Sequence, residues 1–330
     1  MRKLILTLFA AVVLVGCHNE PTPVAPDTPR AIAFDNVTTR AELTDLQTGG
    51  FGVWAVINNT TVQNFMLMNN RHVVYNETDK WHYSPMQYWI DNTTFNFTAT
   101  YPYDENGTYF KFTNNAVELE VSKTPSLIDF LIADNETNTS VEGYDSTVNL
   151  QFQHMLTSVG LKIWRDGGKH QNDQMRIKKV TLGNIRKGGT YSTTTNTWTY
   201  DDNKLTVEMV NNNLSDTDNI GAVIVKDDGT LDSGGDEAAE PFRDLMLLPQ
   251  TLDVDNSVSL KIVYELKRQN AADWEEAELE TVLPSMTLKP GQRYTFNVVL
   301  SSVTDITVYY IQTKVDPWGT PQVGGTVIIK

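Results

Sequence analysis

The sequence predicts an all-β protein built from β-sandwiches. Short segments in which apolar and polar residues alternate recur along the chain, and clusters of Asn, Asp, Gly and Thr separate them. The alternation is clearest at 95–101 and 258–266. No window of a dozen residues carries a convincing helical stripe of apolar side chains. Many short strands with regular turns are typical of a sandwich, and a chain of 330 residues is long enough for two.

Strand-like segments follow one another through most of the chain. They lie at 51–57, 71–75, 95–101, 117–121, 148–152, 161–164, 205–210, 222–225, 258–266, 294–300 and 306–312. Short helices are candidates only near 126–131 and 271–279. The polar stretch 165–173 is the best boundary, so we expect an N-terminal sandwich over 31–165 and a C-terminal one over 166–330.

The first sixteen residues predict export. Arg2 and Lys3 precede an apolar run at 4–15, which suits a signal peptide and is too short to span a bilayer. The run ends in Leu-Val-Gly-Cys, which is a lipobox, and Cys17 is the only cysteine of the chain. We therefore expect a signal peptide at 1–16 and a lipid anchor on Cys17. Four prolines within 17–30 predict an extended tether.

The charge and the cysteine content exclude several classes of protein. The net charge is −15 and the pI about 4.7, so the phosphate backbone of a nucleic acid would repel the chain. One cysteine cannot form an intramolecular disulfide framework or a cysteine-rich zinc site. We expect no nucleic-acid partner.

Motifs that carry chemistry are missing from the sequence. It contains no HExxH, GxSxG or Walker A pattern, and no GxGxxG that follows a strand. The five histidines are not paired at the spacing of metal ligands, and His154 is expected to be structural because it follows an apolar strand. We therefore predict no catalytic residue, no metal site, no cofactor and no enzyme. In the aromatic stretch 81–89, Trp81 and Trp89 are the candidates for exposed rings that contact a glycan.

A series of segments resembles, in order and spacing, the fimbrillin-like (Mfa-like) family, the type V pilins of Bacteroides-type bacteria. The series begins with the lipobox and includes the strand that starts at Phe51 and the aromatic stretch 81–89. Its other members are AIAF (31–34), TRA (39–41), FTATYP (97–102), DFLIA (129–133), VNLQFQH (148–154), LLPQ (247–250), LKI (260–262), LKPGQRYTF (288–296) and VDPW (315–318).

This resemblance implies a fold and a route of assembly. The fold would be two transthyretin-like, Greek-key β-sandwich domains in tandem. The chain would reach the outer membrane surface as a lipoprotein, where a protease would cut after an arginine and remove the first strand. The open groove would then take the C-terminal strand of another fimbrial subunit, of the same or a related kind, by donor-strand exchange.

The residues at the start of the N-terminal sandwich fit that route. Residues 31–37 are strand-like, with Ile32 and Phe34 on one face and Asn36 as a candidate third member. Arg40 follows about ten residues before the next strand, on what should be an accessible loop. A cut after Arg40 would free the strand, whereas a cut after the alternative, Arg30, would release only the tether.

The C-terminal segment 322–330 is the candidate donor strand. Pro321 and two glycines precede a short β-branched run, and Val323, Val327 and Ile329 share one face. Pairing within its own domain, as an ordinary last strand, is an equally supported alternative.

Two functions remain open at this stage. The first is a structural subunit of surface fimbriae. The alternative is an outer-membrane lipoprotein that stays anchored, or a tip adhesin, and binds a glycan or a protein of a host or bacterial surface. Either one places the protein at the cell surface.

Overall fold

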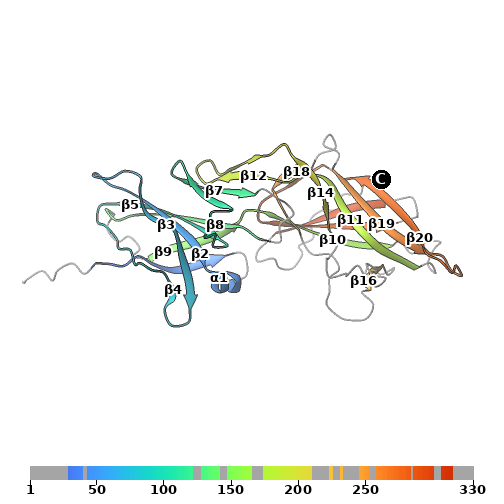
Figure 1. Cartoon of the computed structure of the whole chain (residues 1–330), viewed down its shortest axis with the longest axis horizontal. Helices are drawn as coiled ribbons and strands as arrows, with labels where there is room; N and C mark the ends of the chain where they lie inside the picture. Colours follow the sequence, from blue (N-terminus) through green and yellow to red (C-terminus); the bar gives the residue numbers. More distant parts are fainter. Residues whose placement is uncertain are drawn as a thin grey trace, which may run out of the picture.

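The computed structural model describes residues 29–39, 43–121, 128–141, 147–165, 174–209, 223–225, 231–232, 245–252, 258–283, 285–300 and 306–314. Within these residues the molecule is elongated and almost entirely β (Figure 1). The earlier strands occupy one end of the long axis and most of the later strands the other. The all-β class predicted from sequence is confirmed. The transthyretin-like topology of two domains stays a prediction.

The N-terminal part contains a seven-stranded sheet with the order β1-β9-β8-β5-β2-β3-β4. Its two outermost strands, β1 and β4, contact each other, so the sheet curls around its own core. The strands are β1 (Ala33–Thr39), β2 (Phe51–Asn58), β3 (Phe65–Asn76), β4 (Lys80–His82), β5 (Thr94–Tyr101), β8 (Leu131–Asn138) and β9 (Thr147–His154). The alternation predicted from sequence is visible in β5, where Phe95, Phe97 and Ala99 are buried.

A short helix, α1 (Leu43–Gly49), lies between β1 and β2 in the chain and contacts β3. Its Leu46 is fully buried in the core of the curled sheet. The sequence reasoning missed this helix because seven residues make only two turns, too few to show an apolar stripe.

A four-stranded sheet with the order β13-β12-β7-β6 belongs to the same end of the molecule. It consists of β6 (Phe110–Thr113), β7 (Ala116–Val121), β12 (Gly189–Ser192) and β13 (Thr197–Tyr200). A separate apolar cluster joins it to the outer face of the curled sheet. That cluster contains Trp54, Phe110, Val117, Leu119, Val121, Phe130, Ile132, Met155, Leu156 and Leu248.

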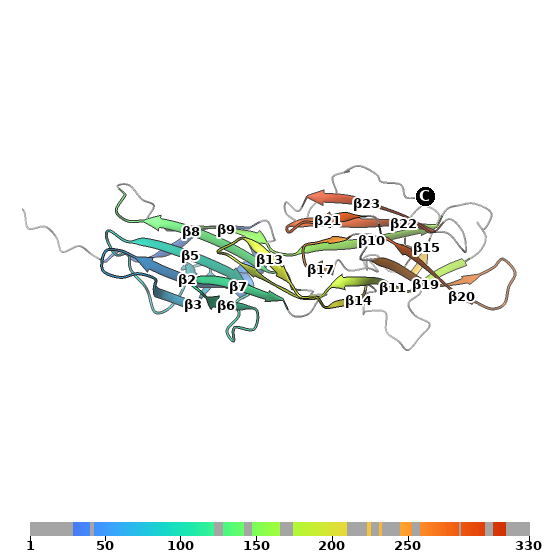
Figure 2. The same ribbon diagram turned by 90° about the horizontal axis from the view of Figure 1, so that it is seen from above.

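Two further sheets form a sandwich at the C-terminal end and lie as separate layers in Figure 2. One has the order β17-β10-β22-β23, with β10 (Thr157–Arg165), β17 (Leu245–Leu247), β22 (Gln292–Leu300) and β23 (Ile306–Lys314). The other has the order β16-β15-β11-β19-β20, with β14 also paired to β11. Its strands are β11 (Gln174–Arg186), β14 (Lys204–Glu208), β15 (Val223–Val225), β16 (Leu231–Asp232), β19 (Ser259–Lys267) and β20 (Glu275–Val282). The small pair β18 (Gln250–Leu252) and β21 (Met286–Leu288) forms a separate two-stranded sheet, and its Leu252, Met286 and Leu288 belong to the apolar core of the sandwich.

The strand pairings do not follow one boundary at 165/166. β10 precedes that boundary but pairs with β17 and β22 of the C-terminal sandwich. β12 follows it but pairs with β7 of the N-terminal part. The division of the chain into 31–165 and 166–330 therefore disagrees with the sheets at these two places.

The prediction of a candidate helix at 271–279 is wrong. β20 occupies most of that range and pairs with β19 along its length. The long strand β11 was missed by the sequence reasoning. Its buried apolar residues are Ile177, Val180, Leu182 and Ile185, and register shifts in its pairings with β14 and β19 break the alternation by twos.

Candidate assembly site

The first strand, β1, is an outermost strand of the curled sheet and pairs in parallel with β9. Its side chains alternate between the core and the surface, because Ile32, Phe34 and Val37 are buried while Ala33 and Asp35 are exposed. The burial of Ile32 and Phe34 on one face is as predicted. The third buried side chain is Val37, because the pairing register shifts between Phe34 and Val37.

The start of β1 is also held on its other side, by residues that precede β5. The backbone amide of Ile32 donates to the Gln87 carbonyl at 2.9 Å, and the amide of Trp89 donates to the Arg30 carbonyl at 2.9 Å. The Tyr83 hydroxyl donates to the Ile32 carbonyl at 2.9 Å. Burial raises the pKa of Tyr83 from 10.0 to about 12, so the phenol keeps the proton for this bond well into the alkaline range. The start of the strand thus sits in a slot between β9 and residues 83–89.

The Phe34 side chain fills an aromatic pocket in the core. It lies edge-on to Phe51, with ring centroids 6.1 Å apart and planes at 88°, and to Phe97, at 6.2 Å and 89°. The Tyr83 ring lies 5.6 Å away at 63°. Edge-on contacts between rings are favourable beyond the area that they bury. The Phe34 ring is therefore a central member of the core rather than a peripheral one.

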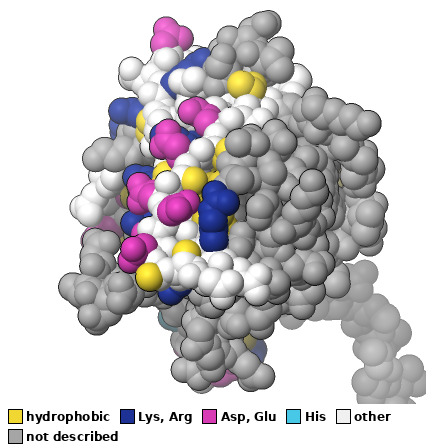
Figure 3. Space-filling view, turned by 90° about the vertical axis from the view of Figure 1, so that its right-hand side faces the viewer, with side chains coloured by type: hydrophobic (Ala, Val, Ile, Leu, Met, Phe, Trp, Pro, Cys, Tyr) yellow, Lys and Arg dark blue, Asp and Glu magenta, His cyan; other side chains and the backbone are white. Residues whose placement is uncertain are grey.

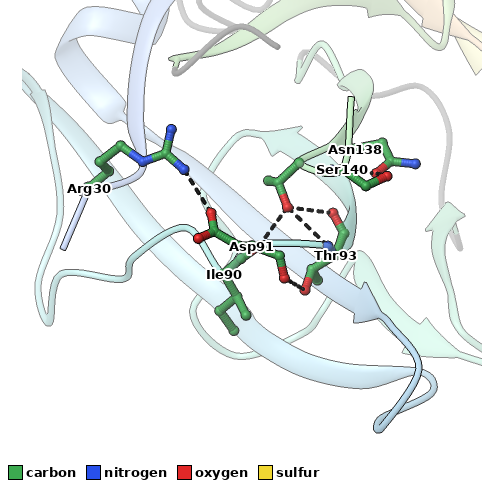
Figure 4. A network of polar contacts seen from close by, with 7 residues as sticks. Arg30, Ile90, Asp91, Thr93, Asn138 and Ser140 are labelled. Atoms are coloured by element: carbon green, nitrogen blue, oxygen red, sulfur yellow. Dashed lines mark hydrogen bonds and ion pairs between the residues drawn. The ribbon is translucent and has the colours of Figure 1, made fainter. Parts of the chain in front are cut away.

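Arg30, the alternative processing residue, lies at the start of this strand (Figure 4). Its guanidinium forms an ion pair with Asp91 at 3.0 Å, and both side chains are at least half exposed. Nearby, the Thr139 hydroxyl donates to the Ile90 carbonyl at 2.6 Å and accepts from the amide of Thr93 at 2.9 Å. An exposed ion pair contributes about 0–1 kcal/mol, so the pair does little to hold the strand.

The expectation that Trp89 is exposed is wrong. Trp89 is 7% exposed and packs edge-on against Phe95, with ring centroids 4.8 Å apart. Trp81 is half-buried and packs against Phe51 at 5.0 Å and Tyr75 at 5.1 Å. The buried Trp89 ring is not available to a glycan, and a glycan contact at the half-buried Trp81 stays a prediction.

The exposed apolar side chains of the same segment are Met86, Tyr88 and Ile90, each between 41% and 46% exposed. Their spacing by twos alternates with the buried Trp89. Because Met86, Tyr88 and Ile90 are themselves apolar, hydrophobic alternation in the sequence could not have identified Trp89 as the inward residue.

A polar pocket of about 360 Å³ lies beside β5 and β8, at the turns of the four-stranded sheet. Amides, hydroxyls and two carboxylates dominate its lining, from Asn96, Thr98, Asn115, Asp134, Asn135, Glu136, Thr193, Thr194 and Asn196. The Thr98 hydroxyl donates to Asp134 at 2.7 Å. Burial raises the pKa of Asp134, and the bond from Thr98 opposes that shift.

His154 is buried, as predicted, and its Nδ1 lies 2.5 Å from a carboxylate oxygen of Asp129. Across the described residues no group of three His, Cys, Asp or Glu side chains could hold a metal ion. In the same part of the chain, no helix has the length and apolar character needed to cross a membrane.

The described surface at the C-terminal end is charged, with acidic and basic side chains next to one another (Figure 3). On β19 and β20, Lys261 pairs with Glu278 at 2.8 Å, and Lys178 of β11 pairs with Glu276 at 3.0 Å. β20 is an outermost strand, and charges on such a strand discourage unintended pairing with other chains.

Several predicted site residues cannot be placed. Cys17, Arg40, Val323, Val327 and Ile329 lie outside the described residues. Lipidation, processing after Arg40 and the role of 322–330 therefore stay predictions.

Comparison with solved structures finds proteins with a similar fold. The chain is similar to a fimbrial protein from Bacteroides vulgatus, with 18% identity, a TM-score of 0.65, and coverage of 87% of this chain and 99% of that one. It is also similar to a protein described as a cell adhesion protein from Bacteroides uniformis, at 14% identity and a TM-score of 0.50, with coverage of 87% and 98%. At these identities the likeness concerns the fold. No curated protein matches the sequence.

A family model described as fimbrillin-like matches residues 39–318, which is most of the chain. The resemblance inferred from the ordered sequence segments is thereby confirmed. Membership also points to a structural rather than an enzymatic protein. The chain belongs to the fimbrillin-like family.

Proposed function

We propose that this chain is a subunit of surface fimbriae, exported as a lipoprotein through Cys17 and assembled by strand exchange at the groove that β1 occupies. One observation carries the proposal: the outermost strand β1, together with Ile32 just before it, places three apolar side chains in the core of the N-terminal part. Family membership and the likeness to a fimbrial protein support it. The same family supports a location at the cell surface.

If β1 leaves its groove, the free energy of binding favours its replacement by another strand over an empty groove. Burying each of Ile32, Phe34 and Val37 contributes on the order of 1.5–3 kcal/mol. Removal of β1 would also leave the backbone groups of β9 and of residues 83–89 without their partners. A groove in that state binds any extended segment that restores both sets of contacts.

Arg40 is the processing residue that would make β1 replaceable. β1 ends at Thr39, so a cut after Arg40 would separate the strand from α1 and the rest of the chain. A cut after Arg30 would leave the strand attached. Covalent attachment gives β1 a high effective concentration at its groove, and that advantage over a competing strand disappears once the link is cut.

The test is strand exchange after limited trypsin treatment of the mature chain. A fluorescent peptide of residues 31–40 should enter the groove of protein cut after Arg40, as followed by mass determination and by fluorescence on an unheated gel. Arg30→Ala is the matched control and should be cut after Arg40 and take up peptide normally. Arg40→Ala should stay linked and exclude the peptide. Equal uptake by uncut Arg40→Ala protein would refute the proposed role of Arg40.

The segment 322–330 is our proposed donor to the groove of another subunit. Its β-branched run has the spacing of a strand with Val323, Val327 and Ile329 on one face. Its own-domain pairing is the competing arrangement.

A second candidate function, adhesion through a glycan, is favoured by the polar pocket rather than by tryptophan. Closely spaced amide, hydroxyl and carboxylate groups can hydrogen-bond to the hydroxyls of a sugar. Binding of the purified protein to a glycan array, with loss of binding in Asp134→Ala, would support this function. Equal binding by both proteins would exclude the pocket.

A further inference from the structure

We infer that the groove of this subunit accepts the strand of a different subunit, one with an aromatic side chain at the Phe34 position, and not this chain's own segment 322–330. The inference rests on the proposed function, since it concerns the partner in strand exchange. It would make assembly at this groove heterotypic.

Two walls of the Phe34 pocket, Phe51 and Phe97, are held by contacts with residues outside β1. Phe51 packs on Phe152 with ring centroids 5.3 Å apart, and Phe97 packs on Trp89 at 5.9 Å. All four of these rings are buried. Because the walls are held in place by one another, they cannot close around a smaller side chain, and an aliphatic replacement would leave part of the pocket empty.

The hydrogen bonds of the groove are made to the backbone of the bound strand, so they do not discriminate among side chains. β9 contributes a ladder of backbone hydrogen bonds, and Gln87 accepts from the amide of Ile32. The Tyr83 hydroxyl donates to a carbonyl, which any residue supplies. Selection among competing strands therefore depends on the buried side chains, and the largest of these is Phe34.

The segment 322–330 has no aromatic residue on either face. One face carries Val323, Gly325, Val327 and Ile329, and the other carries Gln322, Gly324, Thr326, Ile328 and Lys330. This holds for either direction of entry and for any register. Whichever face points inward, the segment offers the aromatic pocket no ring, and the apolar members of the first face are glycine or branched aliphatic residues.

The experiment measures competition among labelled peptides for the groove of full-length mature protein cut after Arg40. The reference is the native 31–40 peptide. Its Phe34→Val version should bind at least about tenfold more weakly, because burial and packing of a ring are lost. The matched Ala33→Val version carries the same new residue at an exposed position and should bind as the reference does.

The 322–330 peptide should be as weak as the Phe34→Val version. Two single changes test rescue: Ile329→Phe places a ring two residues after Val327, as Phe34 follows Ile32, and Val327→Phe serves entry in the reverse direction. At least one should recover about tenfold in affinity.

The outcomes distinguish failure of the aromatic requirement from failure of strand exchange. If the native 31–40 peptide binds and the unchanged 322–330 peptide binds equally well, the aromatic requirement is overturned and strand exchange stands. If neither changed 322–330 peptide improves, the requirement is likewise overturned. If no peptide enters, including the native one, strand exchange at this groove fails and the inference fails with it.

Discussion

Tyr83 connects β1 to the aromatic stretch through one hydroxyl group. The group donates to the Ile32 carbonyl and accepts from the amide of Gln87 at 3.3 Å, while the ring packs on Phe34. A single residue thus contacts both the backbone and the buried face of the strand that we propose is exchanged.

We expect Tyr83→Phe to reduce the free energy of unfolding of the N-terminal part by about 1 kcal/mol, because the ring stays but two hydrogen bonds are lost. The measurement is the denaturant midpoint. Tyr88→Phe is the control, because Tyr88 is 46% exposed and its change should have little effect. Equal midpoints for Tyr83→Phe and the unchanged protein would show that the hydroxyl contributes nothing.

The raised pKa of Tyr83 predicts a dependence of stability on alkaline pH. The folded protein binds the phenolic proton more tightly than the unfolded chain does, since the pKa is about 12 in the fold and 10.0 as a model value. The contribution of this group to stability is therefore complete below pH 10 and is lost as pH rises from 10 to about 12. In unfolding experiments across this range, Tyr83→Phe should lose less stability than the unchanged protein.

At the scale of elements, β-bulges change the spacing of the buried residues along a strand. β1 and β11 both shift register within their length, and in each the spacing of buried residues departs from alternation. This is why the alternation of Val258 to Leu266 was easy to recognise as a strand, whereas β11 was not. The sequence shows residue types, but it does not show where a partner strand absorbs an extra residue.

Gly188 lies just before β12, where the backbone passes close to its neighbours. We expect glycine to be essential there for the pairing of β12 with β7. A Cβ atom there would lie 2.4 Å from a carboxylate oxygen of Asp201 and 2.8 Å from the backbone oxygen of Val121 in β7. Gly188→Ala should therefore push β12 away from β7 and cost about 1–3 kcal/mol in unfolding free energy.

The control for this change is Gly49→Ala, whose Cβ would make an ordinary contact of 3.5 Å with the Tyr101 ring. Hydrogen exchange at the paired amides of β7 and β12 should rise in Gly188→Ala and stay unchanged in Gly49→Ala. Unchanged exchange in both variants would mean that the sheet adjusts without loss.

At the scale of the whole molecule, the two ends are joined by a shared apolar cluster. Trp54 and Phe110 of the N-terminal part meet Leu248, which follows β17 of the C-terminal sandwich. The amide of Gly291 also donates to the Leu156 carbonyl at 2.9 Å. These contacts predict that the ends resist separation, as a load-carrying subunit would require.

Leu248→Ala tests this coupling. Leu248 is fully buried, so we expect a loss of about 2–5 kcal/mol in unfolding free energy. Denaturant unfolding followed by circular dichroism should show an earlier and broader transition. Val282→Ala, at a side chain that is 47% exposed, should change little. A loss no larger than that of the control would argue against the coupling.

The sequence by itself determined the all-β class, most of the strands, the family and the inward positions of Ile32 and Phe34. Period-two patterns and ordered segments are properties of residues near one another in the chain, so they can be read without a structure. The burial of Ile32 and Phe34 follows from the same local alternation.

Only the tertiary structure decided which strands pair, that Trp89 is inside, and that β12 lies beside β7. It also decided that three rings distant in the sequence meet around Phe34. These features depend on contacts between segments far apart along the chain, and local pattern carries no information about which segments will meet.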